Sequence, residues 1–328
     1  MSDIIVCQGL TKQYGIRKVV DNLDLKVPEN IVFGFLGPNG AGKSTTMKLL
    51  TGQIKPTAGH AQVAGADVTR NSLQARQHIG YLSEMPNFYS WMKGQELLEF
   101  AGELFGLNPP TRRARAKELL QLVGLADAGG RKVGAYSGGM RQRLGIAQAL
   151  VNRPKVVFLD EPVSALDPLG RRDVLTLLDN IRHEATVFMS SHVLADVDRV
   201  CEQVSILDRG RVIAAGPTVE LKERFALPAI NLEVEGDPAA LERLSAALRA
   251  ESWLKRVTPG EPGRLHLELT SAAQAQEAGQ RVPRLVSELG LSMRSFQSAV
   301  PNLEDVFLQV VNRDERGNAE PTRPEVRV

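Results

Sequence analysis

One nine-residue segment has the residue types and spacing that bind phosphate groups. It reads Gly37-Pro38-Asn39-Gly40-Ala41-Gly42-Lys43-Ser44-Thr45 and matches the pattern GxxxxGK[ST]. Its glycines let backbone N–H groups curl around phosphate oxygens, which a Cβ atom would obstruct. Lys43 would place a full charge at the β- and γ-phosphates, and the Ser44 hydroxyl could ligate Mg²⁺. A glycine-rich turn with a lysine is the alternative, but the strand expected before it and the helix after it favour the phosphate site.

A second segment ends in two neighbouring carboxylates. Residues 156–159 form an apolar run typical of a buried strand, and Asp160 and Glu161 follow it directly. Asp160 at a strand tip can hold Mg²⁺ through water, and Glu161 can orient and polarise the water that attacks a γ-phosphate. A solvated acidic turn is the alternative. Beside the phosphate segment, the pair is better explained as the hydrolytic half of one site.

The elements that position these residues follow from the hydrophobic pattern. Short apolar runs predict buried strands at residues 31–36, 79–82, 156–159, 186–189 and 204–207. Helical periods between them predict helices at residues 43–50, 94–104, 112–123, 140–151 and 171–184. This alternation indicates an α/β fold with a mostly parallel sheet. The start of the chain differs, since runs at 4–10, 23–27 and 61–63 predict a small antiparallel β piece.

A change in composition near residues 217–228 marks a second domain. The predicted order after it is strand 229–234, helix 238–250, strand 253–257, strand 265–269, helix 271–289 and strand 291–296. This βαββαβ order is the split pattern of ferredoxin-like α+β domains. A last helix is expected at 302–311, and the charged residues after it lack an apolar period. We therefore expect domains at 1–227 and 228–312 and a disordered tail at 313–328.

Composition and charge exclude several classes of protein. The chain has 328 residues, and its 40 basic and 38 acidic side chains leave a net charge of +2. These values argue against a disordered chain, a disulfide scaffold or a nucleic-acid coat. Cys7 and Cys201 fit no metal or redox spacing, so we expect buried thiols in a reducing compartment. Without a secretory signal or an apolar run near the roughly 20 residues of a membrane helix, we expect a cytosolic protein.

A third motif narrows the class of phosphate-binding protein. The segment Tyr136-Ser137-Gly138-Gly139-Met140-Arg141-Gln142-Arg143 precedes the Asp160 strand, and a Ser-Gly-Gly at a helix N-terminus can bind an anion. Taken alone, it could be a helix N-cap with a flexible glycine pair. At this position the chain resembles the ATP-binding-cassette (ABC) family, whose LSGGQ signature it matches with Tyr136 for Leu and Met140 for Gln. The resemblance implies that Ser137, Gly138 and Gly139 close on the γ-phosphate of an ATP held by a second subunit.

Other elements of the family pattern occur in order along the chain. The resemblance implies that Tyr14 stacks on adenine, that Asp167 contacts the opposite subunit, and that His192 bonds the γ-phosphate. The family usually has a glutamine that ligates Mg²⁺ after the strand at 79–82, and this chain has Glu84 there. A carboxylate can still bind Mg²⁺, although it adds charge beside the phosphates. Without the resemblance, Tyr14 is an edge-strand tyrosine and His192 an ordinary surface or core histidine.

The resemblance extends over nearly the whole chain and implies an ATP hydrolase that uses ATP and Mg²⁺. Its fold would be the P-loop ATPase domain of that family, with a parallel-sheet core, an antiparallel β subdomain and a helical subdomain. One phosphate loop and one signature cannot serve the same nucleotide within one copy, so two chains would sandwich two ATP molecules head to tail. The second subunit would be an identical or a similar chain, and we expect no nucleic-acid partner.

Two features resemble a subgroup that drives export, the ABC-2-type exporters. They are Glu84, in the pattern Tyr-Leu-x-Glu, and the segment 300–308. This resemblance implies an ATPase that powers a separate membrane permease while bound peripherally to the inner face of the cell membrane. Two alternatives remain, an import ATPase and a soluble ATPase of the family that acts on ribosomes or DNA. The soluble kind usually has tandem cassettes or long coiled-coil inserts, which this chain lacks.

The permease should dock between Glu84 and Leu107, where large apolar side chains gather in a turn-rich stretch. They are Phe88, Tyr89, Trp91 and Met92. Exposed aromatic residues and methionine are common at docking surfaces. The alternative is that they pack in the core of the helical subdomain.

Overall fold

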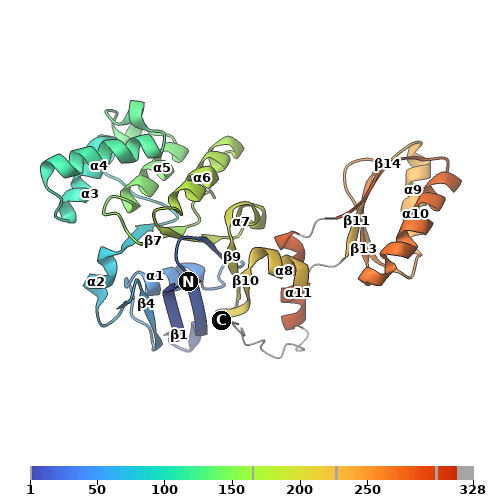
Figure 1. Cartoon of the computed structure of the whole chain (residues 1–328), viewed down its shortest axis with the longest axis horizontal. Helices are drawn as coiled ribbons and strands as arrows, with labels where there is room; N and C mark the ends of the chain where they lie inside the picture. Colours follow the sequence, from blue (N-terminus) through green and yellow to red (C-terminus); the bar gives the residue numbers. More distant parts are fainter. Residues whose placement is uncertain (1, 165, 226–227, 300–301, 316–328) are drawn as a thin grey trace. The chain divides into compact units, whose positions relative to one another are not determined.

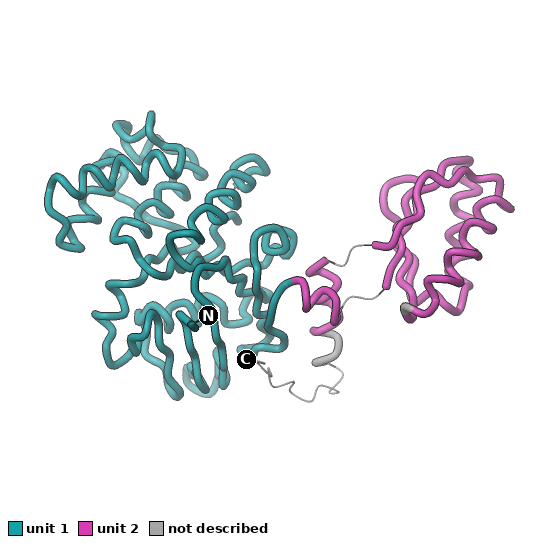
Figure 2. The backbone as a smooth tube through the Cα atoms, in the orientation of Figure 1, with its two compact units in different colours: residues 1–218, 314–328 teal, residues 219–313 magenta. Residues whose placement is uncertain are grey.

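The computed structural model of the chain describes residues 2–164, 166–225, 228–299 and 302–315. The fold divides into two compact units, one formed by Met1–Thr218 with Asp314–Val328 and the other by Val219–Arg313 (Figure 2). The division lies at 218/219, so the helix α8 (Thr218–Phe225) belongs almost entirely to the second unit.

A six-stranded sheet forms the centre of the first unit (Figure 1). Its strands are β3 (Val32–Leu36), β6 (Ile79–Leu82), β7 (Val156–Asp160), β8 (Thr186–Ser191), β9 (Gln203–Asp208) and β10 (Arg211–Pro217). The order is β10-β9-β3-β8-β7-β6, with parallel pairing except between β9 and β10. The strands β3, β7 and β8 are buried along their whole length, which explains their uninterrupted apolar sequences. The predicted parallel core is confirmed.

A smaller antiparallel sheet belongs to the same unit. Its strands, in the order β2-β1-β4-β5, are β2 (Arg17–Pro28), β1 (Asp3–Tyr14), β4 (Ala58–Val63) and β5 (Ala66–Asp67). Here β1 and β2 are each 12 residues long, well beyond the predicted 4–10 and 23–27. Alternate residues of β2 are buried against α1 (Lys43–Leu50) and β3 in one continuous apolar core. The ends of β1 and β2 carry exposed polar residues, so the apolar pattern predicted only the middle of each strand.

The helices of the first unit have identifiable starts. They are α1, α2 (Ser72–Gln77), α3 (Gly94–Leu104), α4 (Pro109–Leu122), α5 (Gly138–Ala149), α6 (Pro168–Ile181) and α7 (Leu194–Val200), with short 3₁₀ turns at Ala126–Ala128 and Val133–Ala135. Asn108, Ser137 and Asp167 cap α4, α5 and α6 by accepting a hydrogen bond from a backbone N–H. These caps start the three helices two or three residues before the predicted positions. Helices α3, α4 and α5 pack on one another as a helical subdomain (Figure 1).

Both cysteines are buried, as expected. Cys7 lies on β1 and Cys201 directly follows α7. Burial raises the pKa of both thiols far above the ordinary value, so neither forms a thiolate at neutral pH. Within the described part of the chain, no helix is both long and apolar enough to cross a lipid bilayer.

The second unit contains the split βαββαβ pattern that the sequence predicts. Its elements after α8 are β11 (Ala229–Glu235), α9 (Pro238–Arg249), β12 (Leu254–Pro259), β13 (Arg264–Leu269), a 3₁₀ turn (Ala272–Gln274), α10 (Ala275–Glu288), β14 (Ser292–Ser298) and α11 (Leu303–Glu315). The sheet order β12-β13-β11-β14 is antiparallel throughout, and its core is apolar. The expected tail from 313 is corrected at its start, because α11 continues to Glu315. Residues 316–328 lie outside the described residues.

Candidate active site

The phosphate segment forms the turn between β3 and α1, as its motif requires. Gly40 and Gly42 have φ angles of 80° and 110°, a region that residues with a Cβ rarely adopt. At Gly42 a Cβ would also lie 2.6 Å from the carbonyl oxygen of Val19. The ammonium of Lys43 donates to the carbonyl oxygen of Gly37 at 2.7 Å and is almost completely buried. The loop is therefore a backbone cradle with one buried cation at its base.

The carboxylate pair lies at the end of the strand β7, and the neighbouring strand β8 holds it in place. Asp160 pairs with Ser190 in the register of β7 and β8, and the Ser190 hydroxyl donates to Asp160 at 2.6 Å. The same hydroxyl accepts from the backbone N–H of Glu161 at 2.9 Å. Glu161 has φ 48°, an unusual left-handed conformation for a residue with a side chain. Such backbone strain is typical of residues held for function.

Two nitrogen groups approach the Glu161 carboxylate. Its Oε1 lies 3.6 Å from the ammonium of Lys43, and its Oε2 lies 2.9 Å from Nδ1 of His192. With Glu161 ionised, Nδ1–H of His192 donates to this carboxylate. Lys43 and Glu161 are both less than 9% exposed, so each compensates the other's buried charge.

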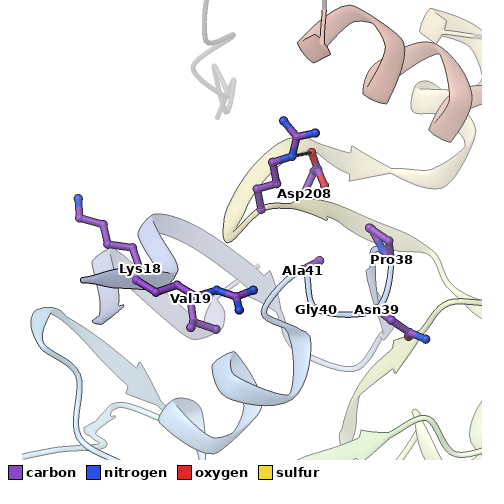
Figure 3. Close-up of a pocket in the computed structure, with 9 residues that line it drawn as sticks. Lys18, Val19, Pro38, Asn39, Gly40, Ala41 and Asp208 are labelled. Carbon is purple, nitrogen blue, oxygen red and sulfur yellow. Dashed lines mark ion pairs between the residues drawn. The ribbon is translucent and has the colours of Figure 1, made fainter. Parts of the chain in front are cut away.

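A cavity of about 320 Å³ brings most of the predicted residues together. Its lining residues are Arg17, Val19, Pro38, Asn39, Gly40, Gly42, Lys43, Ser44, Thr45, Glu84, Glu161 and His192. A second cavity of about 460 Å³ adjoins the outer side of the same loop. In Figure 3 residues 38–41 lie on one side of this outer cavity, Val19 lies on another, and Asp208 on a third. Together they offer room for a phosphate chain at one end and a larger group at the other.

The oxygen donors around the cavity suit Mg²⁺. The Ser44 hydroxyl and the Glu84 carboxylate line it, and both are hard ligands of the kind that Mg²⁺ prefers. Asp160 is buried and lines neither cavity. Burial of Tyr81 raises the pKa of that residue, and the nearby Asp160 carboxylate raises it further. Among the described residues no group of three or more His, Cys, Asp and Glu side chains could hold a metal. This donor set is therefore suited to an ion that shares its shell with phosphate oxygens and water.

Seven predicted residues do not line either cavity: Gly37 and Asp160, described above, and Ser137, Gly138, Gly139, Asp167 and Tyr14. Ser137 is the N-cap of α5, and its Oγ accepts from the backbone N–H of Met140 at 3.2 Å; Gly138 and Gly139 open that helix. Asp167 caps α6 and accepts from the N–H of Gly170 at 3.0 Å. Both are helix N-termini, which favour anions.

Tyr14 is the last of these residues. It ends the strand β1, is 52% exposed, and has the Lys12 ammonium 5.0 Å from its ring centroid. Stacking of Tyr14 on adenine stays a prediction.

The apolar stretch after Glu84 divides into exposed and buried members. Tyr89 and Trp91 are 56% and 67% exposed, whereas Met92 is buried and Phe88 is half-buried. The ring of Tyr89 lies 5.9 Å from that of Trp91 and 6.3 Å from that of Phe100, centroid to centroid. Core packing therefore accounts for Met92, and Phe100 extends the exposed aromatic group.

Sequence reasoning missed Arg17, Val19 and Ser190. Arg17 and Val19 line both cavities, from the start of β2. They belong to no motif, and only the pairing of β1 with β2 brings them near the loop. Ser190 could have been predicted from the sequence. It directly follows the apolar run 186–189, at the carboxyl end of a parallel strand, where functional side chains gather.

A phosphate loop beside a carboxylate-tipped strand in a parallel sheet, with a helical and an antiparallel subdomain, defines an ATP-binding cassette. The family model described as "ABC transporter" matches residues 20–164 of this chain. The chain is 38% identical over 305 residues to the ABC transporter ATP-binding protein YxlF of Bacillus subtilis, covering 93% of this chain and 98% of that one. It is 37% identical over 316 residues to the daunorubicin resistance ATP-binding protein DrrA3 of Streptomyces coeruleorubidus, covering 95% and 97%.

A solved structure agrees with these relatives. It is a dimeric ATP-binding cassette in a post-hydrolysis state bound to ADP and Pi, 26% identical, with a TM-score of 0.59 over 65% of this chain and 98% of that one. The chain belongs to the ABC transporter family, as an ATP-binding subunit that hydrolyses ATP. The expected family and its P-loop ATPase fold are thereby confirmed.

Proposed function

We propose that this chain hydrolyses MgATP at the cavity between its phosphate loop and Glu161, and that the reaction drives a separate export permease. The observation that supports the site most strongly is the shared cavity. Five residues from four separate elements or loops meet there, namely Lys43, Ser44, Glu84, Glu161 and His192. Each has the chemistry that one part of phosphoryl transfer requires.

Lys43 and Glu161 would change partners when the nucleotide binds. In the structure their charges face each other at 3.6 Å in a buried site. A triphosphate at the loop offers the Lys43 ammonium a stronger anion, because it carries several negative charges. Glu161 is then free to orient and polarise the attacking water, while His192, held through Nδ1, would donate Nε2–H to a γ-phosphate oxygen.

Ser44, Glu84 and, through water, Asp160 would hold Mg²⁺ at this cavity. The ion supplies neutralisation of the charge that develops on the β- and γ-phosphate oxygens. Asp160 keeps its orientation through the Ser190 hydroxyl, which also holds the backbone of Glu161. One side chain on β8 therefore aligns both members of the carboxylate pair.

Ser137, Gly138, Gly139 and Asp167 would complete the site of a second copy. They lie at the N-termini of α5 and α6 and line neither cavity of their own chain. Head-to-tail pairing about a twofold axis would bring each Ser137 to the partner's nucleotide. Two identical chains would be enough to complete both sites. The dimeric state of the cassette bound to ADP and Pi supports this proposal.

The dimer is tested by light scattering of Glu161→Gln protein with ATP and Mg²⁺. This variant should hold ATP without turning it over and therefore accumulate as a dimer. Removal of Mg²⁺ by a chelator should return it to monomer, as should replacement of ATP by ADP. A persistent monomer with ATP bound would count against the head-to-tail pair.

The aromatic group on the helical subdomain is the proposed docking site for the permease. Tyr89, Trp91 and Phe100 are exposed, and the ring of Tyr89 lies within contact distance of the other two rings. Aromatic residues of this kind are enriched where proteins bind each other. The double substitution of Tyr89 and Trp91 by Ala should abolish capture of the permease and leave the ATPase of the isolated chain unchanged. Leu73→Ala, at an equally exposed apolar residue on α2, is the matched control.

Export as the direction of transport is supported by the relatives, since DrrA3 is named for resistance to daunorubicin. The experiment is capture of tagged Glu161→Gln protein with ATP from detergent-solubilised membranes of the native cell. A stoichiometric polytopic membrane protein would support the proposal, and its sequence would indicate the cargo. Ribosomal or DNA-repair proteins in its place would contradict it.

A further inference from the structure

We propose that the ion pair between Arg171 and Asp196 is a positioning contact of the hydrolytic site that couples the loop ending at Asp167 to His192. The inference rests on the roles proposed above for Asp167 and His192. Arg171 closes the first turn of α6, and Asp196 lies in the first turn of α7. Neither residue lines the nucleotide cavity, so Arg171 would act through Asp167, which caps its helix, and Asp196 through His192, which lies two residues before its helix.

Asp196 is buried, Arg171 is 35% exposed, and their ion pair is too long to be a hydrogen bond. The side chain of Asp196 is 7% exposed, and its Oδ2 lies 3.6 Å from Nε of Arg171. Within the described part of the chain, neither of these two buried atoms has a hydrogen-bond partner. Buried charged atoms without hydrogen bonds are costly and uncommon in stable proteins. A slightly closer approach of α6 and α7 would convert the contact into a charge-assisted hydrogen bond.

Arg171 moves with Asp167. The backbone N–H of Arg171 donates to the Asp167 carbonyl oxygen at 2.9 Å, in the first turn of the helix that Asp167 caps. A displacement of the Asp167 loop therefore displaces Arg171 as well. On the proposed head-to-tail pairing, this loop is where the second subunit arrives.

Asp196 moves with His192. The helix α7 begins two residues after His192 and has only seven residues, and no side chain caps its N-terminus. A short helix without a cap depends on tertiary contacts for its orientation. Burial raises the pKa of Asp196, and the nearby Glu161 carboxylate raises it further, whereas Arg171, Arg199 and His192 lower it.

The contacts form a closed path around the site. Glu161 leads along the chain to Asp167, Asp167 to Arg171 by a hydrogen bond, and Arg171 to Asp196 by the ion pair. Asp196 leads back along the chain to His192, two residues before α7, and Nδ1 of His192 lies 2.9 Å from Glu161. At 3.6 Å, the ion pair is the longest of the non-covalent contacts in this path. Closure of a second subunit on Asp167 would tighten it and seat His192 for hydrolysis.

The test compares variants of the pair in the full chain. Asp196→Asn removes the charge and keeps the shape, and Arg171→Lys keeps the charge and removes the planar fork. Arg171→Gln and its combination with Asp196→Asn complete a double-mutant cycle. The control is Arg182→Gln, which breaks an ion pair of 2.7 Å with Glu202 at the other end of α6. For each protein, kcat, KM and the Hill coefficient for MgATP are measured, and ATP affinity is measured in the Glu161→Gln background.

The expected result is a loss in kcat without a loss in binding. Asp196→Asn should lower kcat by about 10- to 100-fold, the size expected when a catalytic group is misplaced by a fraction of an ångström to 1 Å. ATP affinity should stay within about twofold, as should the kcat of Arg182→Gln. The Hill coefficient should fall toward one, and the double variant should be no slower than the slower single variant, because both break the same contact.

Two results would overturn the proposal. An unchanged kcat and Hill coefficient in Asp196→Asn would show that the pair has no role in turnover. A loss of activity that matches the loss of folded, ATP-binding protein would make the pair structural only. Full activity of Glu161→Gln would instead contradict the proposed hydrolytic site itself, and this control separates that failure from failure of the ion-pair proposal.

Discussion

The nucleotide-binding unit and the C-terminal unit differ in what they bury. Among the described residues, the buried polar and charged side chains all lie within residues 1–218, and they include Lys43, Asp160, Glu161 and Asp196. The buried side chains of the second unit are apolar, from Ile230 on β11 to Leu291 before β14. Because burying charge is costly, a fold that keeps these groups buried does so for chemistry.

The C-terminal unit buries apolar side chains instead of charged ones. Its strand β11 buries every second residue, and Trp253 is almost fully buried, with its indole N–H donating to Glu251. This is the simplest pattern that stabilises a half-exposed sheet. The contrast teaches that, among the described residues, the buried charges available for catalysis lie in the first unit.

The largest expected effect lies at the buried carboxylate. Glu161→Gln should lower kcat by about 10² to 10⁴-fold, because it removes the group that polarises the attacking water. ATP affinity should be kept or increased, since Lys43 no longer has a competing buried carboxylate. Steady-state ATPase and equilibrium ATP binding measure the two effects. Glu96→Gln, at an exposed glutamate of α3, is the control and should behave as wild type.

A core substitution in the C-terminal unit should have a large effect on the stability of that unit and no effect on ATP affinity. Trp253→Ala should destabilise that unit by about 3–5 kcal/mol, the cost of removing a large buried aromatic side chain. Hydrogen exchange should report opening of residues 229–298 while ATP affinity stays unchanged.

Phe188→Ala is the matched substitution in the first unit. Phe188 packs against Phe33, Phe35 and Phe158 in the central sheet. It should lower both stability and ATP affinity, because β8 also carries Ser190 beneath the site. If Trp253→Ala also abolished ATP binding, the separation of the two units would be contradicted.

A moderate effect is expected at the adenine end. Tyr14→Ala should weaken ATP binding by about 1–3 kcal/mol, the range found for stacking of a base on an aromatic ring. Tyr14→Phe keeps the ring and should bind as wild type, and Tyr89→Ala is an exposed tyrosine control. Equal affinity of Tyr14→Ala and wild type for ATP would make Tyr14 an edge-strand residue only.

The smallest effect is expected at an ion-paired surface group. Hydrogen bonds from Lys18 and then Arg211 lower the pKa of Asp21 below its ordinary value of 3.8. The lowered pKa means that this pair stabilises the fold above pH 3.8 and loses its effect as the pH falls through the lowered value. Arg211→Gln should cost about 0.2–1 kcal/mol at pH 7, in urea unfolding, and nothing at strongly acid pH. A constant difference at all pH values would contradict the ionic cause.

Local signals allowed much of the fold to be predicted from the sequence. The bounds of α1 and α3 were correct, and the predicted parallel strands fell in the correct places, because apolar runs and glycine-rich turns are local features. The βαββαβ order was equally readable from alternation. Helices α4, α5 and α6 begin earlier than predicted, since their N-caps were not used as starts.

The sequence predicted the site residues that lie in short motifs. It did not predict those that reach the site through the pairing of distant segments. Lys43, Ser44 and Glu161 follow from the motifs alone. Arg17 reaches the cavity only through the β1–β2 hairpin, and the Arg171–Asp196 pair joins residues on two different helices. Such contacts have no fixed sequence spacing, so no local pattern could indicate them.

The most direct test of the composite site is complementation between two inactive variants. Lys43→Ala lacks the phosphate contact of its own site, and Ser137→Arg blocks the contact that it would make with a partner's site. In a head-to-tail pair, a mixed dimer contains one intact site, so mixing the two proteins should restore about a quarter of wild-type ATPase activity. Activity no greater than the sum of the separate variants would contradict the account, because it would mean that Lys43 and Ser137 do not act on one ATP from two chains.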